Sequence, residues 1–312
     1  MSSEERHVFI VNPRSAAGAT LRRFERVRAQ FTARLPNLEV WLTKAPGHAT
    51  ELARQALRED VHTLVSVGGD GTNNEIVNGF FDEQGNAFET QTSLGIVTSG
   101  TGGDFRRSFG WSEDPTEALE RIVRRRVKRI DVGRVRFTDE TGKERSRHYL
   151  NIGSFGIGGD IVNTVNHSSK AWGAKASFLL GTIRNMVGYE PQRVRLLCDD
   201  APAMECVVTA VAVANGQYFG GGMHVAPQAN VEDGLFHTVV IEGGGLPLWL
   251  KHGLKIYSGR HQDLPEVRTM PLQRLVAEPM DGRPVLLELD GEACGALPAE
   301  FEVVPKALPL LV

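Results

Sequence analysis

The sequence predicts an α/β nucleotide-binding domain with a doubly wound, mainly parallel sheet, followed by a β-rich antiparallel domain of sandwich or barrel type. Three observations lead to this prediction. The first third of the chain alternates strand and helix patterns, glycine-rich turns follow two of its strands, and strand patterns dominate after about residue 131. Repeated β–α units imply a parallel sheet with helices on both faces, and ligands of such sheets bind at the carboxyl ends of the strands.

Apolar runs and helical spacing place the elements of the first domain, which we assign to residues 1–130. Helical spacing is clearest over residues 20–35, where apolar residues recur every three or four positions. Predicted strands cover 7–11, 39–43, 62–67 and 93–97, and predicted helices cover 20–35, 48–59, 75–81 and 115–126. The apolar tail, 305–312, can return to this domain or join the second one.

Strand patterns dominate residues 131–304, which we assign to a second domain. The predicted strands cover 131–137, 147–153, 193–198, 204–214, 235–241, 267–276 and 285–290. Two helices are predicted within this region, at about 171–188 and 247–258. The first of them is amphipathic, which is more typical of a core helix or one that faces a second subunit than of a helix that dips into a membrane, so a homodimer stays open.

Composition and charge exclude several classes of protein. The chain has 312 residues and a net charge of −3, so it lacks the basic signature of a nucleic-acid binder. Its three cysteines show no CxxC spacing, which fits a reducing cytosol. The chain shows no signal-peptide pattern and no apolar run of about 18 residues. We therefore expect a cytoplasmic protein that meets a membrane only from its surface, at the inner face.

The basic run over residues 121–129 has two interpretations: a solvated helix end, or a footprint for an anionic membrane.

The most informative motif is Gly68-Gly69-Asp70-Gly71-Thr72, between a predicted strand and a predicted helix. Backbone N–H groups at a helix start suit a phosphate group. A carboxylate beside phosphates is repulsive unless a cation lies between them, so Asp70 indicates a Mg²⁺-nucleotide site. The chain contains no GxxxxGK[ST] pattern, so such a site is not a P-loop. The alternative is a tight turn with Asp70 as a helix cap.

Four further segments complete a set that resembles the diacylglycerol kinase catalytic family, in its bacterial soluble lipid kinase form. They are Asn12 to Gly18, Gly100 to Phe105, Pro227 to Leu235, and Leu289-Asp290-Gly291-Glu292. The resemblance covers about residues 7–305, although GGDG alone also occurs in NAD kinases and phosphofructokinase relatives. One departure is Gly103, where the family usually has asparagine.

The resemblance implies ATP and Mg²⁺ as cofactors and an active site between the two domains. Asp70 is expected to engage Mg²⁺ through water, with Asp104 and Asp131 in the same acidic network. The residues expected to line ATP are Asn12, Pro13, Arg14, Ser15, Ala16, Thr43, Gly68, Gly69, Asp70, Gly71, Thr72, Asn74, Glu75, Thr101 and Asp104.

Two acidic sites are expected in the second domain. Phosphoryl transfer needs a base near the acceptor hydroxyl, and Asp290 and Glu292 are both candidates; Asp290 also fits a simple turn residue. The resemblance further implies a structural Mg²⁺ held by the side chain of Asp233 and by the carbonyls of Asn230 and Leu235, since hard cations prefer oxygen ligands. The alternative for this loop is a solvated acidic hairpin.

These features together predict an ATP- and Mg²⁺-dependent lipid kinase that works at a membrane surface. The acceptor stays open between a diacylglycerol-like lipid and a sphingoid base. Two other functions also stay open: phosphorylation of a soluble acceptor such as NAD, and lipid binding without catalysis.

Overall fold

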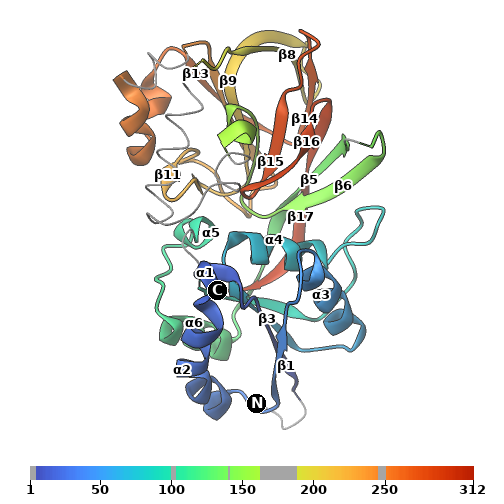
Figure 1. The fold of residues 1–312 in the computed structure, drawn as a ribbon, viewed down its shortest axis with the longest axis vertical. Coiled ribbons are helices and arrows are strands. Elements are labelled where there is room, and N and C mark those ends of the chain that lie inside the picture. Colours follow the sequence, from blue (N-terminus) through green and yellow to red (C-terminus); the bar gives the residue numbers. More distant parts are fainter. Residues whose placement is uncertain (1–4, 100–102, 140, 162–187, 245–250) are drawn as a thin grey trace. The chain divides into compact units, whose positions relative to one another are not determined.

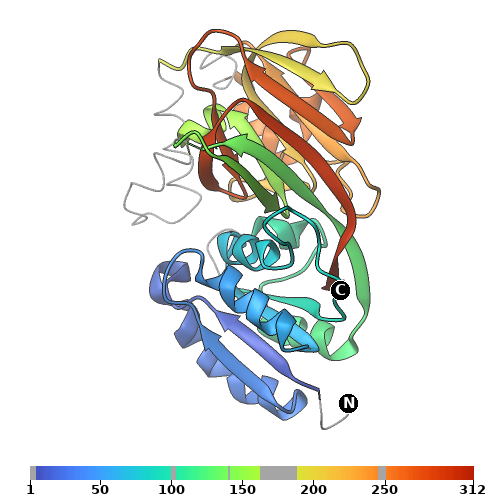
Figure 2. The same ribbon diagram turned by 90° about the vertical axis from the view of Figure 1, so that its right-hand side faces the viewer.

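The computed structural model describes residues 5–99, 103–139, 141–161, 188–244 and 251–312. The chain divides into two compact units (Figure 1). The first unit combines Met1–Asp131 with Lys306–Val312, and the second contains Val132–Pro305. Two long strands, β5 (Val127–Thr138) and β17 (Ala299–Leu311), carry the chain between the units and pair with each other (Figure 2).

The first unit is built on a parallel sheet in the order β2-β1-β3-β4-β17. Its inner strands are apolar runs that are buried on both faces, as helices on both sides require. The strands are β1 (His7–Val11), β2 (Leu38–Leu42), β3 (Thr63–Gly68), β4 (Ser93–Thr98) and the end of β17. The predicted parallel α/β sheet is confirmed, and the C-terminal tail supplies its fifth strand.

Helices cover both faces of this sheet (Figure 1). They are α1 (Ser15–Gly18), α2 (Thr20–Arg34), α3 (His48–Arg58), α4 (Asp70–Asn78), α5 (Asp104–Arg107) and α6 (Pro115–Arg124). Apolar residues of α2 and α6, such as Phe24 and Ile122, share one buried cluster with Phe9 of β1 and Leu311 of β17. The helices α3 and α4 pack against each other on the opposite face.

The helix after the first glycine loop begins earlier than the sequence predicts. The N–H groups of Thr72 and Asn73 both donate to the Gly69 carbonyl, at 3.0 and 3.1 Å. The helix α4 therefore starts at Asp70 instead of residue 75, and Asp70 lies in its first turn. The polar residues that looked like a loop are buried inside the helix.

The second unit is a network of antiparallel strands, which confirms the predicted β-rich fold class. Besides parts of β5 and β17, its main strands are β6 (Glu144–Tyr149), β7 (Ile152–Gly156), β8 (Gln192–Cys198), β9 (Met204–Ala214), β12 (Phe236–Glu242), β13 (Val267–Leu272), β14 (Arg274–Pro279), β15 (Leu286–Leu289) and β16 (Glu292–Ala296). The short strands β10 (Tyr218–Phe219) and β11 (Met223–His224) form a separate pair. Two 3₁₀ segments follow, η1 (Gly253–Ser258) and η2 (Arg260–Asp263).

Three predicted elements of this unit differ in the structure. The predicted strand 267–276 is two strands, because the N–H groups of Gln273 and Arg274 donate to the Asp199 carboxylate instead of to a neighbouring strand. The predicted strand 147–153 is interrupted after Tyr149. The described end of the helix predicted at 247–258 is the 3₁₀ segment η1, while the helix predicted at 171–188 lies outside the described residues apart from its last position.

The basic run over 121–129 does not form a single helix end. The helix α6 ends at Arg124, and Lys128 and Arg129 belong to β5. Arg121 stacks over Trp111, with 4.1 Å from its guanidinium carbon to the ring centre, and donates to the Ile96 carbonyl. Within the described ranges, no helix has the length and apolar character needed to cross a bilayer.

Candidate active site

The loops that follow β1, β3 and β4 are hydrogen-bonded to one another. The Asn12 side-chain N–H donates to the Thr72 hydroxyl at 3.0 Å, which joins the first loop to the start of α4. The Ser99 N–H donates to the Gly68 carbonyl at 2.8 Å, and the Thr20 hydroxyl donates to the Ser99 carbonyl at 2.6 Å. Three segments that the sequence analysis assigned to the nucleotide therefore meet at one edge of the parallel sheet, where strand carboxyl ends bind ligands.

Local sterics explain two of the glycines. A Cβ on Gly68 would lie 2.5 Å from the Thr72 hydroxyl, closer than any real contact, so this position admits only glycine. Gly103 has φ +65°, a left-handed conformation that glycine and asparagine both adopt readily. A Cβ at this position would lie 2.8 Å from Thr98 Cγ2, so the neighbouring threonine favours glycine over asparagine in this chain.

The Asp70 side chain is bonded to the start of α5. Its Oδ2 accepts the backbone N–H of Asp104 at 3.0 Å. The carboxyl group is buried although part of the residue reaches the surface, and no described residue donates a hydrogen bond to Oδ1. Burial raises the pKa of Asp70, and backbone N–H groups of Asp104, Phe105 and Gly103 oppose that rise. A buried carboxylate oxygen without a donor is suited to a cation or to a water bound to one.

The two other acids of the expected network have separate contacts. Asp104 is buried, and its carboxylate lies 3.2 Å from Arg107 Nε. Asp131 is fully buried, and its Oδ1 accepts the backbone N–H of Lys306 at 2.7 Å, where β5 and β17 leave the first unit. The structure thus joins Asp70 to Asp104 through the backbone and places Asp131 at the connection between the units.

The remaining nucleotide candidates lie around these loops. The Glu75 carboxylate accepts the Ala49 N–H at 3.1 Å, so its described contact is the start of α3. Asn74 is buried and bonds within α4 to Asn78, while the Thr43 N–H donates to the Val11 carbonyl. Arg14 is exposed, and its N–H donates to Asn12 Oδ1. Thr101 lies outside the described residues. Pro13 and Gly69 belong to the loops already described, Ser15 and Ala16 lie in α1, and Gly71 lies in the first turn of α4.

Asp290 forms the turn between β15 and β16, with φ +49° followed by φ +85° at Gly291. Its two carboxylate oxygens accept three backbone N–H groups, from Leu150 at 2.8 Å, Asn151 at 2.9 Å and Ile152 at 3.1 Å. These bonds explain why the chain leaves strand geometry between β6 and β7. Glu292, the other base candidate, is exposed at the start of β16.

Glu288 was missed by the sequence analysis. It is fully buried in β15, where Ser154 Oγ donates to Oε1 at 2.5 Å and the Gly291 N–H donates to Oε2 at 2.9 Å. Burial raises the pKa of Glu288 to about 8, against the opposing effect of these two donors. The signal was present in the sequence: an acid in the middle of the apolar run Leu286-Leu287-Glu288-Leu289, directly before the Asp290 turn.

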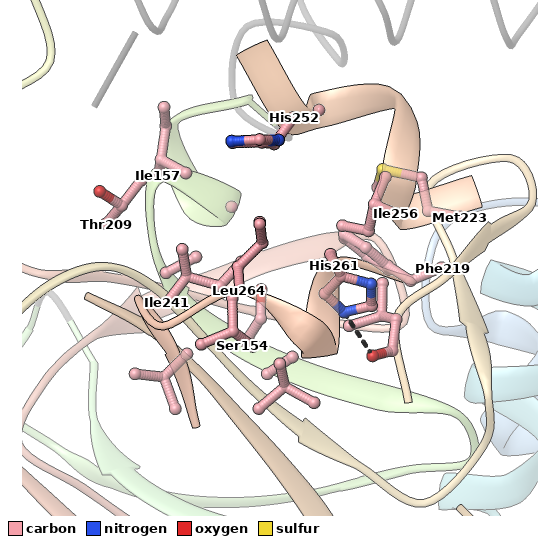
Figure 3. A pocket seen from close by; sticks show the side chains of 18 of the residues that line it. Ser154, Ile157, Thr209, Phe219, Met223, Ile241, His252, Ile256, His261 and Leu264 are labelled. Carbon is pink, nitrogen blue, oxygen red and sulfur yellow. Dashed lines mark hydrogen bonds between the residues drawn. The ribbon is translucent and has the colours of Figure 1, made fainter. Parts of the chain in front are cut away.

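An apolar cavity of about 140 Å³ lies in the second unit (Figure 3). Ile157, Ile241, Ile256 and Leu264 point into it, and no Asp, Glu, Lys or Arg occurs among the described residues that line it. Ser154, which bonds to Glu288, is one of its few polar wall residues. The wall includes residues of β7, β9, β10, β11, β12, β13 and the segment that contains η1 and η2, so residues far apart in the sequence enclose it.

Thr209 and two histidines add the other polar side chains of this wall. His261 Nε2 lies 3.0 Å from the Val225 carbonyl and must carry the proton, so Nδ1 is an acceptor, and no described residue donates to it. Burial lowers the pKa of His261, which keeps the ring neutral. The pKa of His252 is also lowered, first by desolvation and then by Lys255 and Lys251. The cavity is therefore uncharged and apolar, with isolated hydrogen-bonding groups.

The described residues contain no cluster of three or more His, Cys, Asp or Glu side chains that could hold a metal ion. In the loop predicted to bind a structural Mg²⁺, Asp233 Oδ1 accepts the Leu235 N–H at 3.0 Å, and Oδ2 lies 3.7 Å from His237 Nε2. The Asn230 carbonyl accepts the Asp233 N–H at 3.5 Å. One carboxylate with backbone oxygens fits a Mg²⁺ that keeps most of its waters, and so does Oδ1 of Asp70, the oxygen to which no described residue donates.

Two family models divide the chain between them. The diacylglycerol kinase catalytic domain matches residues 6–135, and the YegS C-terminal NAD kinase beta sandwich-like domain matches residues 152–312. The chain belongs to the bacterial lipid kinases of the diacylglycerol kinase catalytic family. The recognised family resemblance is thereby confirmed.

Named relatives of this lipid kinase support the same assignment. A protein of Chromohalobacter salexigens named "Probable lipid kinase YegS-like" is 32% identical over 206 residues, which cover 66% of this chain and 62% of that protein. "Diacylglycerol kinase" of Bacillus subtilis is 25% identical over 297 residues, which cover 94% of this chain and 91% of that protein. A crystal structure of a diacylglycerol kinase from Bacillus anthracis str. Sterne shares the fold, with a TM-score of 0.71 and 20% identity over 98% of this chain and 96% of that one.

Proposed function

We propose that this lipid kinase transfers the γ-phosphoryl group of ATP to the hydroxyl of a diacylglycerol-like lipid, with Mg²⁺ as cofactor. The observation that carries the choice of acceptor is the uncharged, apolar cavity of the second unit. An apolar cavity of roughly 150 Å³ stays dry and takes up an apolar guest, which a hydrocarbon chain supplies and a nucleotide does not. A sphingoid base carries an ammonium group, and no described wall residue offers it a carboxylate.

In this proposal the first unit binds the phosphoryl donor, ATP. Its three connected loops meet at the start of α4, and the N-terminus of a helix favours a phosphate. Asn12 and Thr72 hold two of these loops in register through their side-chain hydrogen bond. Mg²⁺ bound near Asp70 would neutralise charge on the phosphates. The Asp104 N–H bonds to Asp70 Oδ2, and Oδ1, to which no described residue donates, is the oxygen that this role requires.

The base that accepts the hydroxyl proton is Asp290 or Glu292 in this proposal, and their contacts predict different consequences of mutation. Asp290 holds three backbone N–H groups, so its loss disturbs the β6–β7 connection as well as any chemistry. Glu292 is exposed, and its replacement by glutamine should leave the fold intact. A base is identified by a loss of kcat with an unchanged KM for ATP.

The function is tested by incubating the protein with labelled ATP, Mg²⁺ and separate acceptors: dioctanoylglycerol, a sphingoid base and NAD. We expect label in the diacylglycerol product alone. Transfer to NAD without transfer to a lipid contradicts the proposal and indicates a soluble acceptor. Binding of Mg²⁺-ATP by calorimetry without transfer to any acceptor indicates a catalytically inactive lipid-binding protein.

The cavity is tested by filling it. Ala212 lines the cavity on β9, and Ala212→Phe places a ring inside it. We expect at least a tenfold loss in kcat/KM for dioctanoylglycerol, with the affinity for ATP unchanged. Val207 lies on the same strand with 47% of its surface exposed, so Val207→Phe is the matched control and should keep full activity. Equal activity of both variants contradicts the assignment of the cavity to the acceptor.

A further inference from the structure

The segment around η1 has two unlike faces. Gly253 and Ile256 line the apolar cavity, while Leu254 and Tyr257 face outward. Leu254 is 79% exposed and Tyr257 is 38% exposed, and Leu254 is the most exposed large apolar side chain among the described residues. Residues three positions apart lie on the same side of a 3₁₀ helix, so Leu254 and Tyr257 form one outward pair.

Three cations lie close to this pair in the sequence. Lys251, Lys255 and Arg260 are exposed, and none of them makes an ion pair with a described carboxylate. Other exposed arginines of the second unit are engaged: Arg193 with Glu205, Arg268 with Glu242, Arg274 with Glu300, and Arg283 with Glu190. The acids nearest in sequence are Asp263 and Glu266, so the stretch from Lys251 to Arg260 itself carries only positive charge.

We propose that Lys251, Leu254, Lys255, Tyr257 and Arg260 form a docking surface for an anionic lipid bilayer. Apolar and aromatic side chains enter the headgroup boundary, while cations nearby bind anionic headgroups. The other face of the same segment is the cavity wall, so docking brings the cavity next to the bilayer that holds the acceptor. The inference rests on the proposed function, because only an acceptor held in a membrane requires the cavity to lie next to a bilayer.

The surface is tested by sedimentation with vesicles of phosphatidylcholine, with and without phosphatidylglycerol, in the absence of ATP. We expect the protein to bind the anionic vesicles and to dissociate as salt is raised. Lys251→Glu with Lys255→Glu should weaken binding by at least about 25-fold, since each cation near an anionic surface contributes about fivefold. Leu254→Asp should weaken it by about tenfold or more, because an exposed leucine that enters the bilayer is replaced by a charge.

Matched controls come from the first unit and from the β5–β6 turn. Phe88 is 43% exposed and Lys143 is exposed, so Phe88→Asp and Lys143→Glu make the same chemical changes elsewhere. Both should bind vesicles as the wild type does. Equal binding by Leu254→Asp and the wild type overturns the inference, as does a wild type that does not bind anionic vesicles. A change in oligomeric state of Leu254→Asp on gel filtration also overturns it, in favour of contact between two copies.

The kinase assay separates this inference from the proposed function. With monomeric dioctanoylglycerol, Leu254→Asp should react at the wild-type rate, because no bilayer is involved. With long-chain diacylglycerol in anionic vesicles, its rate should fall in proportion to the lost binding. Absence of transfer to any lipid contradicts the proposed function, whereas unchanged rates on vesicles contradict only the docking surface.

Discussion

At the scale of single residues, two carboxylates of the second unit lie two positions apart in the sequence but have different surroundings. Asp290 is surrounded by backbone N–H donors, while Glu288 is buried with one hydroxyl and one N–H. The sequence pointed to Asp290 through its motif. It marked Glu288 as an acid within an apolar run but could not show its partner, because Ser154 is 134 positions away on β7, the strand that pairs with β15.

Glu288 should make stability depend on pH. Its pKa is about 8 in the folded protein against an ordinary value of 4.5. Between these values the unfolded chain has lost the proton and the folded protein keeps it, so the free energy of unfolding falls as pH rises from about 4.5 to 8. Glu288→Gln should remove this fall, which is on the order of a few kcal/mol. Urea unfolding at pH 5 and pH 8 measures it. The exposed Glu144→Gln should keep the wild-type slope.

Asp290→Asn and Glu292→Gln should differ in stability. Replacing one carboxylate oxygen of Asp290 by an amide places a donor against backbone N–H groups, which costs about 1–3 kcal/mol. Glu292→Gln should change the free energy of unfolding by less than about 0.5 kcal/mol, as for most exposed positions. Thermal unfolding of both variants checks this difference, and equal midpoints contradict the bonding described for Asp290.

At the scale of elements, buried strand patterns were the most predictable part of the chain. The parallel strands were placed within a residue or so, because runs such as His7–Val11 are buried on both faces and leave a clear apolar signal. Helix α4 was predicted to start too late, since Thr72, Asn73 and Asn74 look like loop residues until their buried partners are known. The cavity was not predictable because its wall combines several distant strands with a 3₁₀ segment.

The contact between α3 and α4 gives a prediction for Glu75. Its carboxylate accepts the Ala49 N–H in the first turn of α3, an interaction typical of a helix cap. Glu75→Ala should lower the free energy of unfolding by about 1 kcal/mol, and Glu75→Gln, which keeps an acceptor oxygen, by less. If this contact is the main role of Glu75, the KM for ATP should change less than twofold in both variants. A large rise in KM instead assigns Glu75 to the nucleotide.

At the scale of the whole molecule, the first unit depends on residues from both ends of the chain. Leu308 and Leu310 are fully buried and Leu311 nearly so, and β17 pairs with β4 through Leu310 and Leu94. The apolar tail indicated burial but not which domain it joins, because an apolar strand fits the edge of either sheet.

Leu310→Ala should therefore act on the nucleotide-binding unit. Removing a fully buried leucine side chain costs about 2–5 kcal/mol. The melting temperature of the first unit should be lower in the variant, and Mg²⁺-ATP should still raise it. Thermal unfolding with and without nucleotide measures both effects. The matched change at an exposed position, Leu254→Ala, should leave that temperature unchanged.

The hydrogen bond between Asp131 and the Lys306 N–H has a consequence for how this chain can be rearranged. The points where the chain leaves and re-enters the first unit are one hydrogen bond apart, at 2.7 Å. The intervening 132–305 segment is thus a cassette whose two ends meet, the geometry in which domain insertions are tolerated. A short linker from 131 to 306 should close the first unit on itself, and cassettes from relatives should be interchangeable at the same two positions.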